Sequence, residues 1–173
     1  TLSPAAQGFH PADTRAMQGY EFCAANGLPV FVETATDFAP TAMLEFARPY
    51  LFDEVARAFP DLTLVISGLG WPWVEETVAL LAKQPRVYAD IAALLRTPYL
   101  AYQCLLTAYQ FGAMRKLLFG SDFPFLLAAT AIERLYRMAF QEVGVSELSV
   151  ASKKPSGLDA AVAMREFNEI ESE

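Results

Sequence analysis

The sequence predicts an α/β fold in which a parallel sheet is covered by helices. Four short apolar runs, at 28–32, 62–66, 87–91 and 116–119, alternate with segments of helical periodicity. The runs contain few polar residues, as strands covered on both sides do. Strands separated by helices pair in parallel. We therefore expect consecutive βα units rather than hairpins.

The first helix is expected at 12–26 and ends at Asn26-Gly27. Its apolar residues fall on one face, namely Ala16, Met17, Tyr20, Cys23 and Ala24. Further helices are expected at 44–59, 72–83, 97–113 and 126–142. In the helix expected at 72–83, Pro72 is expected in the first turn, with Glu75 and Glu76 near the positive end of the helix dipole.

The chain of 173 residues is long enough for one domain with a sizeable core. We assign residues 1–145 to this domain and 146–173 to a polar loop followed by a short helix at about 158–170. The chain begins with Thr1 rather than Met, which fits either processing or a piece of a longer polypeptide.

Composition narrows the classes of partner. The net charge of −7 argues against nucleic acid and anionic membrane surfaces. No signal segment and no apolar run of about 18 residues is seen, so we expect a soluble protein without a membrane span, its compartment unknown. Hydrophobic residues make up 54% of the chain, which indicates that part of its surface is covered by something else.

Cys23 and Cys104 stand 81 positions apart, with no C-x-x-C spacing. Both have apolar neighbours, which favours two buried free thiols over a single disulfide, and the redox compartment stays open.

The segment 117–125 is the richest in chemical information. Its apolar run reads as a strand buried on both faces, and Asp122 follows at the carboxyl end, where parallel α/β folds place their catalytic groups. Asp122 is therefore a candidate catalytic acid or metal ligand. The alternative is an acid that caps the next helix or binds loop amides.

Several phrases together indicate a family. They are Gln7–Met17, Gly27–Val30, Ala47–Pro49, Asp53–Arg57, Phe59–Leu62, Leu69-Gly70, Pro72–Glu76, Val87–Asp90 and Leu117–Phe125. In order and spacing they resemble the amidohydrolase-related family, in the branch of aminocarboxymuconate-semialdehyde decarboxylase-like enzymes, over about residues 2–125. The resemblance implies a (β/α)₈ TIM-type barrel with a divalent metal, usually zinc, at the carboxyl ends of the strands. It implies that this chain supplies strands five to eight, a partial barrel. The first four strands, with the His-x-His pair of the family, would precede Thr1.

The chain departs from the family pattern at two of its metal-binding positions. Glu33 stands where strand five usually carries a histidine, and Gly68 stands where strand six carries one. Asp122 alone matches, and there the family acid binds metal or transfers protons. The only histidine, His10, lies in a turn-forming phrase and is expected at the surface. A zinc site of about three protein ligands therefore cannot be assembled from this chain.

Two further site hypotheses remain. Glu33, Asp90 and Asp122 could converge to hold Mg²⁺ or Mn²⁺, or two of these carboxylates could share a proton. Trp71 could fill the volume of a metal and its water, or pack at a loop base beside Trp73.

A half-barrel has two open sheet edges, expected near Val30 and Leu118. We therefore expect a protein partner: a second copy, a separate amino-terminal half or other subunits. The leading hypothesis is a degenerate, non-catalytic module with a structural or pairing role and no cofactor. The alternative is a metal-dependent hydrolase or decarboxylase of a small molecule, which binds zinc or another divalent metal only when another chain completes the barrel.

Overall fold

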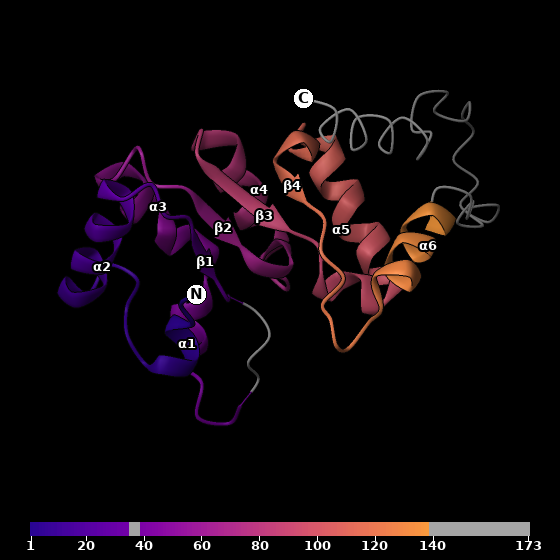
Figure 1. The fold of residues 1–173 in the computed structure, drawn as a ribbon, viewed down its shortest axis with the longest axis horizontal. Helices are drawn as coiled ribbons and strands as arrows, with labels where there is room; N and C mark the ends of the chain where they lie inside the picture. Colours follow the sequence, from indigo (N-terminus) through magenta and orange to yellow (C-terminus); the bar gives the residue numbers. More distant parts are fainter. Residues whose placement is uncertain (35–38, 139–173) are drawn as a thin grey trace.

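The computed structural model describes residues 1–34 and 39–138, and it contains a four-stranded parallel sheet (Figure 1). The strands are β1 (Val30–Val32), β2 (Leu64–Ile66), β3 (Val87–Asp90) and β4 (Leu117–Leu118). They lie side by side in sequence order. This arrangement confirms the predicted partial barrel of βα units.

Six α-helices connect or flank the strands within the described part of the chain. They are α1 (Pro4–Gln7), α2 (Thr14–Ala25), α3 (Phe52–Ala58), α4 (Val74–Lys83), α5 (Pro98–Gln110) and α6 (Ala128–Met138). Short 3₁₀ turns are η1 (Leu44–Ala47), η2 (Pro49–Leu51), η3 (Ser67–Gly70), η4 (Ala93–Arg96) and η5 (Met114–Lys116). Among these helices, none combines the length and the apolar character that crossing a bilayer requires. The polar loop and the helix expected at 146–170, and the end of the helix at 126–142, lie outside the described residues.

The first predicted helix is confirmed by α2. The Asp13 side chain accepts a hydrogen bond from Arg15 N at 2.9 Å and so caps the helix. The five apolar residues predicted on one face are its buried or half-buried residues, while the others are exposed.

The single helix expected at 44–59 is wrong. The chain there forms η1, η2 and then the short α3. Arg48 separates the two turns with an extended backbone, φ −71° and ψ 122°, because it precedes Pro49, whose ring disfavours a helical residue before it. Pro72 is likewise outside its predicted helix. Trp73 N bonds to Gly70 O at 2.8 Å in a turn that contains Pro72, so α4 begins only at Val74.

The two faces of the sheet differ in burial. The residues that face the helices are at most 5% exposed and belong to the main core, namely Val30, Val32, Leu64, Ile66, Val87, Ala89 and Leu117. On the opposite face, Phe31, Val65 and Tyr88 align across β1, β2 and β3. At the two edges of this face, Phe31 is 41% exposed and Leu118, beside Asp90, is 37% exposed, whereas Val65 is buried at 2%. We call this second side the inner face. The strand predicted at 116–119 was expected to be buried on both faces, but β4 (Leu117–Leu118) is buried on one face only.

The two sheet edges also differ. Leu2 forms a parallel bridge with Val32 on the outer side of β1. Leu2 N donates to Phe31 O at 2.9 Å, and Glu33 N donates to Leu2 O at 2.8 Å. The edge near Val30, expected to be open, is thus partly covered by the start of the chain, which Figure 1 places beside β1. In the described residues, no strand pairs with the outer edge of β4.

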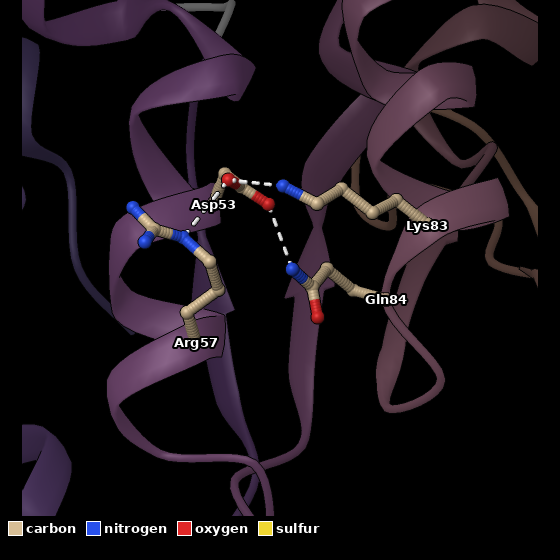
Figure 2. A network of polar contacts seen from close by, with 4 residues as sticks. All are labelled: Asp53, Arg57, Lys83 and Gln84. Carbon is tan, nitrogen blue, oxygen red and sulfur yellow. Dashed lines mark hydrogen bonds and ion pairs between the residues drawn. The ribbon is translucent and has the colours of Figure 1, made fainter.

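A polar network ties α3 to the end of α4 (Figure 2). Asp53 accepts hydrogen bonds from Lys83 Nζ at 2.6 Å, Gln84 Nε2 at 2.7 Å and Arg57 Nε at 3.2 Å. The bonds from Lys83 and Gln84 hold the pKa of Asp53 below its ordinary value, although partial burial opposes them. The network lies at the amino end of β3, where it fixes the packing of two neighbouring βα units.

Candidate functional site

Because the strands are parallel, the segments that follow them gather at one edge of the sheet. Asp122 follows β4, Asp90 ends β3, Gly68 follows β2 and Glu33 follows β1. All four positions singled out in the sequence therefore lie at the carboxyl end of the sheet. Their side chains, however, have different environments.

Asp122 is engaged by an arginine that sequence reasoning missed. Arg96 Nε lies 2.9 Å from Asp122 Oδ2, and the Asp122 side chain is 25% exposed. Oδ2 itself is buried and accepts no hydrogen bond of normal geometry from the described residues, so the ion pair is its compensation. Asp122 has a left-handed backbone, φ 61°, and its carbonyl accepts bonds from the N–H groups of Phe125 and Leu126. In the described residues, Oδ2 neither caps a helix nor accepts a hydrogen bond from a loop amide.

Arg96 is held in place from several sides. It ends η4, and its guanidinium carbon lies 5.2 Å from the centre of the Phe125 ring. Arg134 Nη1, from α6, donates to the carbonyls of Leu95 and Arg96, each at 2.9 Å. The backbone that presents Arg96 to Asp122 is thus fixed by a second arginine. No sequence signal links these residues, which lie 26 and 38 positions apart.

Asp90 has a structural role. Its Oδ1 accepts hydrogen bonds from Gly68 N at 3.1 Å and Ala92 N at 3.0 Å. The carboxylate therefore ties the loop after β2 to the end of β3. An oxygen that already accepts two backbone bonds is a poor candidate for metal binding.

The loop after β2 is built from left-handed residues. Gly68, Leu69 and Gly70 have φ values of 56°, 51° and 67°, and Leu69 is fully buried. A Cβ on Gly70 would lie 1.9 Å from Thr77 Oγ1 and 2.8 Å from Pro49 Cγ. Gly68 brings no side chain to the site. Trp71 is half-buried and packs against the core, which agrees with the packing interpretation of this residue.

Glu33 and His10 lie at the surface. Glu33 is exposed, and its N–H belongs to the bridge with Leu2. His10 Nδ1 accepts a hydrogen bond from Ala12 N at 3.1 Å, and its ring meets Phe46 edge to face at 5.9 Å. The surface position predicted for His10 is confirmed.

Both cysteines are free. Cys104 is buried and Cys23 is half-buried, so the predicted free thiols are confirmed but only one is fully buried. Burial raises the pKa of Cys104 to about 11. Its thiol is protonated at neutral pH, so Cys104 has the character of a core residue and not of a nucleophile.

The residues present do not fit a zinc centre. Within 1–34 and 39–138, no three His, Cys, Asp or Glu side chains gather closely enough to hold a metal ion. The donor chemistry gives the reason: Asp122 is paired with a cation, Asp90 is bonded to amides, and Gly68 has no donor. The same facts weigh against the convergence of Glu33, Asp90 and Asp122 on Mg²⁺ or Mn²⁺.

Comparisons with known proteins define the class. The profile of the amidohydrolase family, Amidohydro_2, matches residues 1–153. The parallel sheet and its helices are those of a partial TIM-type barrel. The chain belongs to the amidohydrolase family.

Solved structures agree with this fold. An uncharacterized TIM-barrel protein from Bordetella bronchiseptica is similar over 97% of this chain and 55% of its own, with 23% identity and a TM-score of 0.63. For a putative metal-dependent hydrolase from Lactobacillus casei, the coverages are 90% and 40%, with 19% identity and a TM-score of 0.67. An amidohydrolase from Burkholderia multivorans with bound zinc is similar over 90% of this chain and 58% of its own, with 19% identity and a TM-score of 0.55. This chain thus spans roughly half the length of these relatives. No curated protein matches.

Proposed function

We propose that this chain is a non-catalytic amidohydrolase-family module whose role is to pair with another polypeptide. The ion pair between Arg96 and Asp122 is the observation that carries the proposal. It compensates the one acid that matches the family pattern, while Gly68 and the exposed Glu33 replace the histidines of strands six and five. The module keeps the fold of the family without its donor set.

The inner face supports the pairing role. Phe31 and Leu118 are 41% and 37% exposed on a sheet whose other face is buried. Beyond β4, three large apolar residues are more than 60% exposed, namely Phe123, Phe125 and Leu127. Covering such surface is worth about 25 cal/mol for each Å² removed from water. Among residues 1–34 and 39–138 no strand pairs with the outer edge of β4, so a further strand could bind its backbone groups.

The bridge made by Leu2 favours a second candidate function. Its parallel course beside Val32 is the course of another barrel strand next to β1. An amino-terminal half from a separate chain could therefore continue the sheet and supply the His-x-His pair. The complex would then be a metal-dependent hydrolase or decarboxylase of a small molecule, with Asp122 as its acid.

Light scattering and metal analysis of the purified chain test the main proposal. We expect a species larger than the 19.0 kDa monomer and no stoichiometric zinc. Leu118→Ser should weaken the association, whereas Phe22→Ser, at a 64% exposed position on α2, should leave it unchanged. A compact monomer at micromolar concentration contradicts the pairing role. One zinc per chain, bound by this chain alone, contradicts the non-catalytic role.

Mixing the chain with the first four βα units of a full-length relative tests the second candidate. Metal uptake and hydrolysis or decarboxylation by the complex would support it. Asp122→Asn should then abolish turnover, and full activity of that variant would exclude the second candidate.

A further inference from the structure

We propose that the Arg96 guanidinium is the resident cation of Asp122 and holds the place beside this acid that a divalent metal ion would need. This inference rests on the proposed function and deepens it, because it adds, to the lack of neighbouring donors in the described residues, a reason why Asp122 itself does not bind a metal ion. It concerns two residues of this chain and requires no partner.

The argument starts from Asp122 Oδ2. This oxygen is buried and has no hydrogen-bond partner of normal geometry in the described residues. An ionised oxygen removed from water requires a nearby positive charge or a proton. Arg96 Nε, 2.9 Å away, is the charge that the fold supplies.

The support of Arg96 indicates a built arrangement rather than a chance surface pair. Phe125, three residues after Asp122, lies against the guanidinium at 5.2 Å. Arg134 fixes the carbonyls of Leu95 and Arg96 from α6. Arg96 is thus held by groups from the same loop as the acid and from the next helix. By contrast, the pair of Arg137 and Glu133 on α6 lies four residues apart on the surface, with the arginine side chain 76% exposed.

A guanidinium in this place excludes a second cation. It has no lone pair to offer a metal, and its charge repels another positive ion at the same carboxylate. Removing the side chain should therefore both destabilise the fold and open a position for a cation.

Four variants test this inference by thermal unfolding with and without millimolar MnCl₂: Arg96→Ala, Asp122→Asn, the double variant and Arg137→Ala. We expect Arg96→Ala to lower Tm by several degrees and the double variant to unfold at a higher Tm than Arg96→Ala. Mn²⁺ should raise the Tm of Arg96→Ala only by a small amount, because Asp122 would be its one protein ligand there, and it should not raise the Tm of the wild type or the double variant. Arg137→Ala, the matched control, should change Tm little.

Additive losses in the double variant would overturn the inference, as would an Mn²⁺ shift of equal size in the wild type. If Arg96→Ala does not fold, a folded double variant supports the inference and an unfolded one overturns it. These results do not depend on association or turnover. A failure of the inference is therefore seen as additive losses in Tm, whereas a failure of the pairing role is seen as a monomer in light scattering, and the two outcomes are distinguishable.

Discussion

The helix-covered side of the sheet and its carboxyl end differ in what their polar side chains do. On the covered side they join neighbouring elements: Arg48 pairs with Glu76, and Asp53 joins α3 to Lys83 and Gln84. At the carboxyl end, Gly68 offers no side chain, Glu33 is exposed, and Asp122 is bound by Arg96. Packing and chemistry are thus separable in this fold, because the core does not need the metal ligands in order to form.

The largest expected loss of unfolding free energy comes from the helix-covered face of the sheet, and a variant on the inner face provides the comparison. Phe52 is fully buried under the covered face, so Phe52→Ala should cost about 3–5 kcal/mol of unfolding free energy. At a dilution where the chain is monomeric, Phe31→Ala on the inner face should cost no more than about 1 kcal/mol, because Phe31 is already 41% exposed in the single chain. Urea unfolding measures both. Equal losses would mean that the inner face is covered in solution.

The next effect separates packing from backbone strain in the loop after β2. Gly70→Ala should cost about 2–4 kcal/mol, because its Cβ would overlap Thr77 and Pro49 and its φ is 67°. Gly68→Ala, with a φ of 56° but no atom closer than 3.8 Å, should cost about 1–2 kcal/mol. Chemical denaturation of the two variants checks the order, and a reversed order would contradict the described loop.

The smallest effect concerns the network at the amino end. Asp53→Asn should cost about 1 kcal/mol at pH 7, since it removes the charge that Lys83 and Arg57 contact. The pKa of Asp53 is lowered by folding, so its contribution is complete above about pH 4, near the ordinary Asp value, and is lost as the pH falls through the lowered value. The difference between wild type and variant should therefore shrink in acid.

Denaturant midpoints from pH 7 down to pH 3 measure this dependence. Glu54→Gln, at the exposed position next in sequence, is the control and should show little loss at pH 7. A difference for Asp53→Asn that stays constant over this range would contradict the ionic role of the network.

The parts of the fold that sequence reasoning predicted are those encoded locally. The strands and the buried side of α2 follow from hydrophobic spacing over a few residues, which a reader of the sequence can see. Pro49 also indicates a break at Arg48, but the apolar spacing over 44–59 predicts one continuous helix, and that prediction is wrong. For the candidate site, the sequence places Glu33, Gly68 and Asp122 at the carboxyl ends of the strands, whereas nothing in it indicates that Arg96 and Arg134 lie beside Asp122.

By itself, the sequence determined that this protein is a parallel βα array of the amidohydrolase family and that positions 33 and 68 hold Glu and Gly. Those properties depend on residue type and near-neighbour spacing. Only the tertiary structure decided that Arg96 compensates Asp122, that Asp90 serves backbone amides, and that Leu2 bridges the outer side of β1. The paired residues lie 26, 22 and 30 positions apart, respectively, when Asp90 is counted to Gly68. Contacts over such distances in the sequence arise only once the chain has folded.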